Sequence, residues 1–519
     1  MNQNASTQSN GLLQVSTGKT SRFSVQIGVW AVLCGLFASA MIAVSWVGFL
    51  ETDDLAYAEA AEGWLRHAPF LGQSHWALRH FIVLPVATAF SVFGHHERAL
   101  AVPMLVYGTG LLLMMGFCVG RLAGPVAGVL APGLIATVPA FAFGATFVVT
   151  DVPEAFFVIG SFWAFYFATA SQRRRVFVLS GLLAGCGFLT RETSVALLVP
   201  YAILFLVGYG KRSNYLWMGT GFVAVVGLNA LFLWLLSGDP LWSIHVSQTG
   251  LAGDSPYTPG LKAPAGVDDP FGIFSLPRPV QAVLMLFASP TIGLLPWLGV
   301  PAAAYLAWSS PPGEAGTAAR LFALLAVSWF TVVSFVFLIL WLIPRYQIVT
   351  LCALAVPASI LLADWLNRGW RVCVTAVLIP MFGAGLLLSA ASDHGLLFGE
   401  RALVDFVSHE NEPVRTDPAT LRGARWLLQS VGAEDRVTAA PPIPGGLYFV
   451  NHKPRRRLPA GWTVQEIPPQ STIVATFTEK PGLIALVASY LGLDRILPAV
   501  LWHKIDRTPR KAEVMRIPL

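Results

Sequence analysis

The sequence has few charged residues for its length. Only 12% of its 519 residues are Asp, Glu, Lys or Arg, and 55% are hydrophobic, whereas a soluble globular chain carries roughly a quarter charged residues. This shortage excludes an ordinary water-soluble enzyme. The charge that is present lies late in the chain, since 29 of the 62 charged residues come after residue 391. The composition therefore predicts a polytopic membrane protein with a polar C-terminal tail.

Other features that would indicate a different class are also missing. The five cysteines lie in or beside apolar runs and are neither paired at metal-ligand spacing nor gathered in a polar disulfide framework. The net charge of +6 is not accompanied by a dense Lys and Arg face with exposed aromatics, so no nucleic-acid partner is indicated. No A-x-A-like cleavage site follows the first apolar run, which we expect to be retained. The lipid bilayer is the partner that the composition predicts.

Eleven apolar segments are candidate transmembrane helices, for which about 20 residues are needed. They run over residues 25–47, 99–119, 124–141, 153–170, 176–189, 194–209, 216–236, 280–308, 320–343, 346–362 and 371–391. The segment 81–93 is shorter, and we expect it to lie along the membrane interface. The cytoplasmic loops then hold eleven Lys and Arg but only two acids, in agreement with the positive-inside rule. We therefore predict a cytoplasmic N-terminus and a tail outside.

The predicted fold is an all-α polytopic membrane protein with a small C-terminal α/β domain. Residues 1–24 are polar and expected to be disordered, 25–391 form the transmembrane module, and 392–519 form the extracytoplasmic domain. In this domain apolar spacing indicates one helix and three short strands. These are Leu421–Val431, Arg436–Ala440, Leu447–Val450 and Ile473–Phe477. A further apolar run, Gly482–Leu493, is too short for a twelfth span.

Ionisable residues gather where predicted spans end on the outside. Asp53 and Asp54 follow the first span, Asp151 the third, Arg191 and Glu192 the fifth, and Arg345 and Tyr346 the ninth. Such residues mark functional sites when they face a cavity. Plainer interpretations are that the acids cap helices and that the arginines anchor at the interface. Because capping does not require two acidic clusters on one side of the membrane, the functional interpretation is favoured.

These residue types suit the transfer of a sugar. A hydroxyl that attacks a sugar C1 needs a carboxylate to take its proton, and a phosphate leaving group needs cations. Asp53 is the candidate base, with Asp151 orienting the acceptor or sharing a metal. Arg191 and Arg345 are candidates to hold the phosphate, because guanidinium matches its oxygens. Adjacent acids are a weak metal signal, so a divalent cation, Mg²⁺ or Mn²⁺, is left open.

The sequence resembles the GT-C superfamily of polytopic glycosyltransferases over roughly residues 25–370. It is most similar to the family that includes protein O-mannosyltransferases and lipid A aminoarabinose transferases. Four motifs carry the resemblance in order along the chain. They are Asp53-Asp54-Leu55-Ala56-Tyr57, Thr150-Asp151-Val152-Pro153, Leu189-Thr190-Arg191-Glu192 with Pro200, and Arg345-Tyr346 with Pro357.

The resemblance implies an inverting glycosyltransferase of the bacterial inner membrane. Its donor would be a sugar on a polyprenyl phosphate, and its acceptor an extracytoplasmic glycolipid, polysaccharide or protein. The catalytic carboxylate falls on Asp53, and residues 55–67 and 81–93 become interfacial helices of the first outer loop. One segment, Gln73–His80, departs from the Lys-Pro-Pro of the aminoarabinose transferases. The substrate-binding candidates beyond Arg191 and Arg345 are Asp54, Tyr57, Arg79, His80, Glu192 and Tyr346.

Two other functions remain open on the sequence alone. A transporter or flippase would favour charges near mid-span and repeated, broken helices, whereas the span centres here are almost free of ionisable residues. A non-catalytic membrane scaffold would tolerate loss of the acids. Substitution of Asp53 by Asn separates the three functions, because only the transferase needs that carboxylate.

Overall fold

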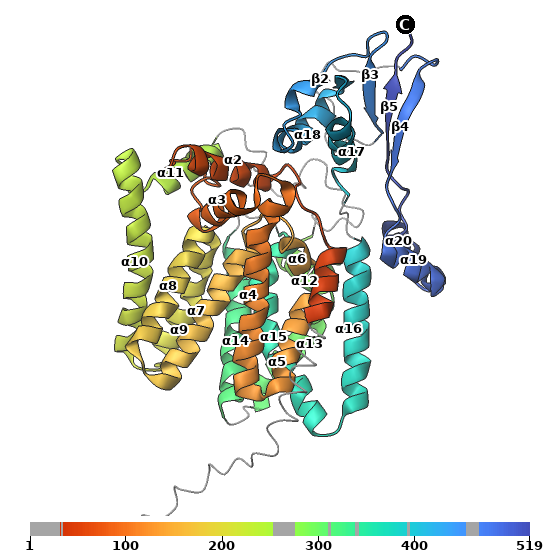
Figure 1. Cartoon of the computed structure of the whole chain (residues 1–519). Coiled ribbons are helices and arrows are strands. Elements are labelled where there is room, and N and C mark those ends of the chain that lie inside the picture. The colour runs from red at the N-terminus through yellow and green to blue at the C-terminus, as the bar shows by residue number, and fades with distance from the viewer. Residues whose placement is uncertain are drawn as a thin grey trace, which may run out of the picture.

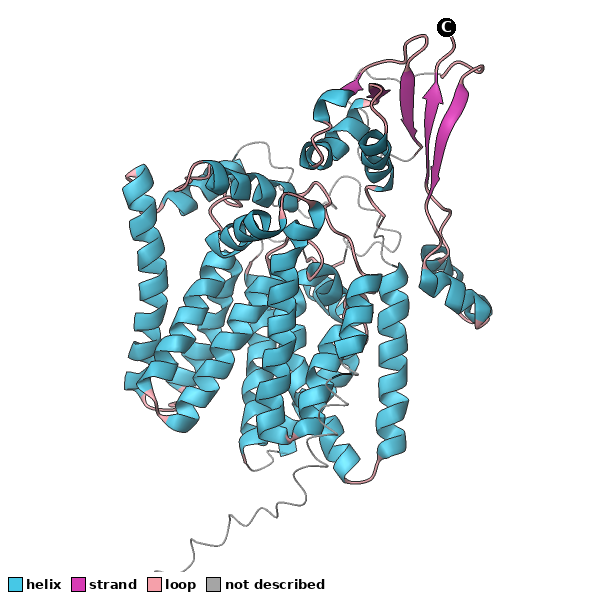
Figure 2. Cartoon of the chain, in the orientation of Figure 1, coloured by secondary structure: helices cyan, strands magenta, loops and turns pink. Residues whose placement is uncertain are grey.

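The computed structural model describes residues 32, 35–252, 276–309, 313–337, 342–391, 395–452 and 467–519. The predicted disordered stretch 1–24 and the start of the first predicted span lie outside these residues. In the described part, helices form a bundle, and strands occur only after residue 413, in a domain at one end of it (Figures 1 and 2).

Long apolar helices form the body of the bundle. Within the described residues, six helices are long and apolar enough to cross a membrane. They are α4 (Glu97–Ala123), α7 (Asp151–Ser171), α10 (Arg212–Ser237), α14 (Glu314–Thr331) with the π-helical η3 (Val332–Val336), α15 (Ile348–Asn367) preceded by η4 (Pro344–Gln347), and α16 (Arg371–Ala391). The chain is thus a mostly helical, multipass membrane protein.

Shorter helices lie between the long ones. They are Gly35–Val44, α5 (Pro125–Ala136), α6 (Pro139–Gly144), α8 (Arg174–Thr190), η1 (Glu192–Leu197), α9 (Leu198–Leu206), α11 (Trp242–Ala252), α12 (Arg278–Ala288) and α13 (Leu295–Ser309). The count of eleven spans is therefore not confirmed. The expected span 280–308 is two helices, broken around Pro290 and Gly293, and the span 124–141 is broken before Pro139. Proline interrupts helices because it lacks an N–H and clashes with the preceding turn.

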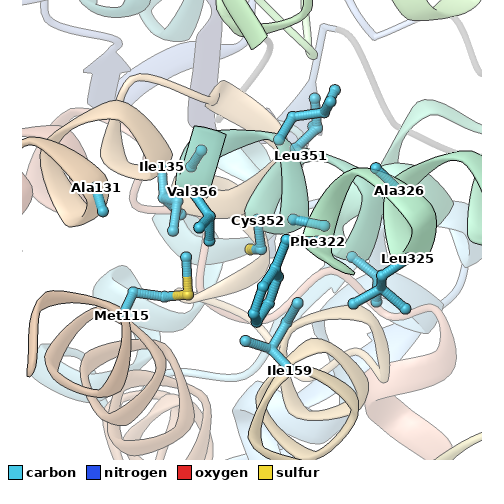
Figure 3. Packing of buried hydrophobic residues seen from close by; sticks show 14 of the residues in the cluster. Met115, Ala131, Ile135, Ile159, Phe322, Leu325, Ala326, Leu351, Cys352 and Val356 are labelled. Carbon is cyan, nitrogen blue, oxygen red and sulfur yellow. The ribbon is translucent and has the colours of Figure 1, made fainter. Parts of the chain in front are cut away.

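The hydrophobic core lies where α4, α5, α7, α14 and α15 meet (Figure 3). Phe322 of α14 and Cys352 of α15 are fully buried there. Nearby, α8 packs closely on α10 through glycines, because a Cβ on Gly181 or Gly221 would collide with a carbonyl of the other helix. Small residues let membrane helices approach at their backbones. Because α7 also packs on α8, the positions of the ends of α7 and α8 are fixed relative to each other.

Two helices lie across the end of the bundle that carries the C-terminal domain (Figure 1). They are α2 (Asp53–Arg66) and α3 (His80–Phe93), which fall on the segments expected to be interfacial. The buried face of α2 contains Tyr57, Ala58 and Ala61, whereas Glu59 is exposed. This arrangement, in which α2 and α3 cover the ends of longer helices, defines what we call the α2 end of the bundle.

The C-terminal domain is a five-stranded sheet with helices. Its elements are α17 (Phe398–His409), β1 (Val414–Thr416), α18 (Pro418–Ser430), η5 (Glu434–Arg436), β2 (Val437–Ala439), β3 (Leu447–Asn451), β4 (Thr472–Thr478), α19 (Leu483–Tyr490), η6 (Leu493–Arg495), α20 (Ala499–Ile505) and β5 (Lys511–Arg516). The strand order is β2-β1-β3-β5-β4. β1 runs parallel to β2 and β3, and β5 runs antiparallel to β3 and β4.

The predicted helix and three strands of this domain are present as α18, β2, β3 and β4. The start of α18 follows from its sequence, because Asp417 accepts hydrogen bonds from the N–H groups of Ala419 and Thr420, with Pro418 in the first turn. The short β1 and the C-terminal β5 were not predicted. β5 nevertheless forms the centre of the antiparallel part, where Phe449 pairs with Val514 and both are fully buried.

Candidate functional site

Asp53 is the first residue of α2 and is presented by a bent segment that Asp54 stabilises. The carboxylate of Asp54 accepts hydrogen bonds from the backbone N–H groups of Leu50 (2.5 Å) and Thr52 (2.6 Å), and from the Thr52 hydroxyl (3.0 Å). Asp54 is fully buried, so this predicted substrate-binding residue instead holds the turn. The side chain of Asp53, by contrast, is 41% exposed.

Arg345 joins the two acidic clusters. Its Nη2 atom lies 3.9 Å from Asp53 Oδ2, and its Nε atom lies 3.4 Å from Asp151 Oδ2. Acids almost a hundred residues apart in the chain therefore meet at the α2 end of the bundle. Both contacts are long, and Nε has no hydrogen-bond partner among the described residues. The Arg345 side chain is 31% exposed, which leaves it with donor capacity for an anionic ligand.

Arg191 lies deeper and binds Asp151 more closely. Its Nη1 atom donates to Asp151 Oδ1 at 2.6 Å and lies 3.5 Å from Glu154 Oε2. Its guanidinium carbon lies 3.9 Å from the centre of the Tyr346 ring, a cation–π contact. Asp151, Glu154 and Arg191 are all buried. Because Asp151 is the first residue of α7 and Arg191 follows the last residue of α8, this ion pair joins the ends of two packed helices.

Glu154 is a member of this site that sequence analysis did not single out. Its Oε1 atom accepts hydrogen bonds from the hydroxyls of Thr193 (2.5 Å) and Ser194 (3.1 Å). Thr150 makes no side-chain cap of α7, so the acids of this turn do not serve as a capping motif. The signal that points to Glu154 is its spacing of three residues from Asp151, which puts both carboxylates on one face of α7.

Arg79 links α2 to η1 beside Asp53. Its Nη1 donates to the Tyr57 hydroxyl at 2.8 Å, and its Nη2 donates to Glu192 Oε2 at 3.1 Å. Tyr57 interacts electrostatically with both Asp53 and Arg191, and its complete burial raises the pKa of its phenol. Glu192 is exposed. The predicted residues Tyr57, Arg79 and Glu192 thus form one hydrogen-bonded row next to the Asp53 and Arg191 side chains.

Burial lowers the pKa of both histidines near Arg79. Burial, and then the charge of Arg79, lower the pKa of His75 to about 4. Burial also lowers the pKa of His80. The Nδ1 atom of His80 lies 3.1 Å from Asn229 Oδ1, and its ring meets Phe232 edge-on. His80, predicted to bind substrate, is thus in a packing contact that holds α3 against α10.

The described residues contain no group of three or more His, Cys, Asp or Glu side chains that could hold a metal ion. At the site itself, the carboxylates face other partners. Asp151 is paired with two guanidinium groups, and Asp54 accepts from backbone amides. A hard cation such as Mg²⁺ needs oxygen ligands without competing cations, so the surroundings of Asp151 and Asp54 do not suit a divalent metal.

The C-terminal domain reaches the segment that precedes Asp53. Arg401 of α17 donates through Nη2 to the carbonyl oxygens of Val47 and Phe49, both at 2.8 Å, and to Glu97 Oε1 at 2.5 Å. Glu97 Oε1 in turn accepts the backbone N–H of Phe49 at 2.7 Å. The backbone just before the Asp53 turn is thus fixed by a residue of the C-terminal domain and by the first residue of α4.

A second contact holds the C-terminal domain on α2. Trp426 of α18 donates its indole N–H to Glu62 Oε1 at 3.1 Å, and His95 Nε2 lies 2.6 Å from the same oxygen. The Trp426 ring also stacks on Phe49, with the ring centres 4.6 Å apart. The C-terminal domain therefore docks on both ends of the stretch that carries Asp53.

We expect Arg401→Met to loosen the backbone of residues 47–52. A hydrogen bond to a charged group contributes about 1.5–3 kcal/mol, so amide exchange in this segment should accelerate roughly ten- to hundred-fold, at 1.4 kcal/mol for each factor of ten. Hydrogen exchange of the full chain, read by mass spectrometry, measures this. Arg425→Met is the matched control, because Arg425 is an exposed arginine of the same domain paired with Glu434. If amide exchange of residues 47–52 were unchanged in Arg401→Met, the hydrogen bonds of Arg401 would not be what fixes this backbone.

Comparison with known proteins gives a family match for part of the chain and a fold match for most of it. Residues 82–236 match the model of the dolichyl-phosphate-mannose-protein mannosyltransferase family. A comparison with curated proteins finds no match by sequence. The apo structure of ArnT from Cupriavidus metallidurans matches 82% of this chain and 93% of its own, at 13% identity and a TM-score of 0.55. The ArnT structure bound to undecaprenyl phosphate matches over the same shares, at 14% identity and a TM-score of 0.54.

The chain has the GT-C fold. The predicted resemblance of this GT-C chain to O-mannosyltransferases and to the ArnT type of transferase is confirmed. The matched range includes Asp151 and Arg191, whereas Asp53 lies before it and Arg345 after it. Taken together, the GT-C fold and the partial match to a mannosyltransferase family support a glycosyltransferase.

Proposed function

We propose that this GT-C chain is an inverting glycosyltransferase that moves a sugar from a polyprenyl-phosphate donor to an acceptor. The acceptor is a glycolipid, a polysaccharide or a protein on the side of the membrane where the C-terminal domain lies. The observation that carries the proposal is the pairing of the partly exposed Asp53 with the partly exposed Arg345, which also contacts the buried Asp151, itself paired with the buried Arg191. A base and a phosphate-binding cation thus lie at one place.

In this proposal the roles follow from exposure. The acceptor hydroxyl gives its proton to Asp53 while its oxygen forms the bond to the sugar C1. The bond between C1 and the phosphate oxygen breaks with its electron pair, and Arg345 stabilises the charge of the leaving phosphate. Attack from the side opposite the phosphate inverts the configuration at C1. Asp151 is buried between two arginines, so we assign it to positioning Arg345 and Arg191 rather than to contact with the acceptor.

The donor class is supported by the two kinds of relative. The matched family is named for dolichyl-phosphate mannose, and one ArnT structure holds undecaprenyl phosphate. Both are polyprenyl phosphates. We propose that the row formed by Tyr57, Arg79 and Glu192 lines the same substrate site, because Tyr57 interacts electrostatically with Asp53 and Arg191 and Arg79 joins Tyr57 to Glu192. We place the enzyme in a bacterial inner membrane, with a cytoplasmic N-terminus and the C-terminal domain outside.

We also propose that arginine, and not a divalent cation, holds the phosphate. EDTA should therefore leave the rate of transfer unchanged. Arg345→Met should raise the donor KM at least about ten-fold, because a hydrogen bond to a charged group contributes about 1.5–3 kcal/mol. Both effects are measured from steady-state rates of transfer in nanodiscs at varied donor concentration. Arg66→Met is the control, because Arg66 is an exposed arginine at the far end of α2. Loss of transfer in EDTA that Mg²⁺ or Mn²⁺ restores would overturn this assignment.

The transporter alternative gains no support from the charge distribution. In the long described helices, ionisable residues lie near the ends, such as Glu97 and Arg121 of α4 or Arg212 of α10. A transport pathway needs such groups near the middle of the membrane. The site described above lies at one end of the bundle, where a reaction at the membrane surface would take place.

The proposed function is tested by comparing the cell envelope with and without the intact gene. Mass analysis of glycolipids, polysaccharides and glycoproteins should show one sugar mass missing from one class of molecule in the deletion strain. Return of the intact gene should restore that mass, and the missing mass identifies donor sugar and acceptor together. The same missing mass, but with the lipid-linked sugar accumulated on the cytoplasmic side of the membrane and not on the outer side, would favour the flippase instead.

A further inference from the structure

The function proposed above does not use the apolar run in the C-terminal domain. This run forms α19 and continues through η6 to α20. Its large apolar side chains are exposed to an unusual degree, with Leu486 at 54%, Leu491 at 62%, Ile496 at 76% and Tyr490 at 91%. A contiguous exposed apolar surface marks a site of interaction with a protein or a membrane. The stretch from α19 to Ile496 therefore exposes large apolar side chains, which water does not favour.

The position of these helices relates them to the membrane-spanning part. Both α19 and α20 contact α16, one of the six helices long and apolar enough to span a membrane. Figure 1 shows them beside the end of α16 and away from the sheet, to which only the strands β4 and β5 connect them. The exposed apolar side chains thus lie next to the end of a membrane helix.

A cavity lies beside the contact between this helix pair and the bundle. It has a volume of about 470 Å³ and is lined by Ala43 and Val44 of the first helix, Ala390 of α16, and Ile484 and Ile505 of the pair. Its charged lining residues are two acids and two bases, Glu479, Lys480, Asp506 and Arg507. The apolar part of the wall suits the acyl chain of a phospholipid, and the charged part, which holds both signs, suits its polar headgroup.

Charge supports the same partner. The stretch from Lys480 to Arg507 contains four basic residues and two acidic ones, a net charge of +2. They are Lys480, Arg495, Lys504 and Arg507, with Asp494 and Asp506. Short amphipathic helices with basic residues beside an apolar face lie in the headgroup region and bind anionic lipids.

We propose that α19 and α20 form an interfacial anchor, seated in the membrane leaflet on the side of the C-terminal domain. The exposed apolar residues lie among acyl chains, and a phospholipid fills the cavity against α16. The domain then has two attachments, one to the α2 end through Arg401 and Trp426 and one to lipid through α19 and α20. The partner is the phospholipid bilayer, and neither a second copy of the chain nor another protein is needed to cover this face.

The test is the accessibility of a spin label in nanodiscs that hold one copy of the full chain. Leu486→Cys is labelled in a variant whose five native cysteines are replaced and whose unfolding temperature matches that of the native chain. Ile473→Cys is the matched control, since Ile473 is an apolar residue of β4 exposed to 55%. The ratio of collisions with oxygen to collisions with a water-soluble nickel complex should be several-fold higher at Leu486. A label at Leu486 that is as open to nickel as the control, or is shielded from both reagents by protein, would overturn the proposal.

A second measurement uses the native sequence, so that it does not depend on the substitutions. Nanodiscs are prepared with a phospholipid that carries a photoreactive diazirine in its acyl chain. After illumination, the label should appear on peptides that cover residues 483–496 and be absent from peptides of β4. Labelling of the spanning helices without labelling of 483–496 would show that lipid does not reach this face, and would also overturn the proposal.

Discussion

Asp53→Asn is expected to lower the rate of sugar transfer about 10²- to 10⁴-fold, the usual contribution of a general base. The amide has the shape of the carboxylate but cannot take the proton of the acceptor hydroxyl. The side chain is 41% exposed, and its ion pair with Arg345 is long at 3.9 Å, so the fold should tolerate the change. Transfer of labelled sugar from a polyprenyl phosphate, followed in nanodiscs, measures the effect, and the unfolding temperature shows that the chain is intact.

Glu59→Gln is the control for this substitution. Glu59 is an exposed carboxylate on the same helix, and its replacement by Gln should leave transfer within two-fold of the native rate. Asp54→Asn is not a suitable control, because Asp54 holds the turn through backbone N–H groups. Normal turnover in Asp53→Asn would remove Asp53 from the mechanism as the base, whereas absence of transfer in the native chain itself would favour the scaffold.

The charged pairing at the site could be predicted from the sequence because of how the spans alternate. In the predicted topology Asp53, Asp151, Arg191 and Arg345 each follow an odd-numbered span, so the sequence predicts that they lie on one side of the membrane. Their order and residue types then indicated the chemistry. The partners of each side chain could not be predicted in this way. Asp54 is adjacent to Asp53, yet it is buried in the turn, a difference that depends on the local backbone rather than on residue type.

Other parts of the structure depend on contacts between distant segments. Arg401 binds the carbonyls of Val47 and Phe49 across more than 350 residues of sequence, and no local pattern predicts such a pair. The helix breaks at Pro139 and Pro290 were not predicted, because the apolar sequence continues across each of them. A proline is nevertheless present at each break. The last strand, β5, was not predicted from the sequence. It pairs with β3 and β4, and such tertiary contacts decide strand formation more than propensity does.

Arg191→Met is expected to reduce the stability of the bundle by about 3–5 kcal/mol, the loss found when one partner of a buried ion pair is removed. Asp151 would keep only its long contact with Arg345, and Glu154 would keep only the hydroxyls of Thr193 and Ser194. The cation–π contact with Tyr346 would also be lost. Denaturant unfolding in a mild detergent, monitored by tryptophan fluorescence, measures the change.

The other end of α8 provides the control. Arg174 is exposed, and its guanidinium carbon lies 5.2 Å from the centre of the Trp217 ring, a contact that contributes about 0.5–1 kcal/mol at an exposed site. Arg174→Met should therefore cost no more than this amount. The double variant Arg191→Met with Asp151→Asn should be more stable than Arg191→Met alone, because it no longer leaves the Asp151 charge buried without its closest partner. Equal losses for Arg191→Met and Arg174→Met would mean that the buried pair does not hold α7 and α8 together, and that Arg191 is free to act on the substrate phosphate instead.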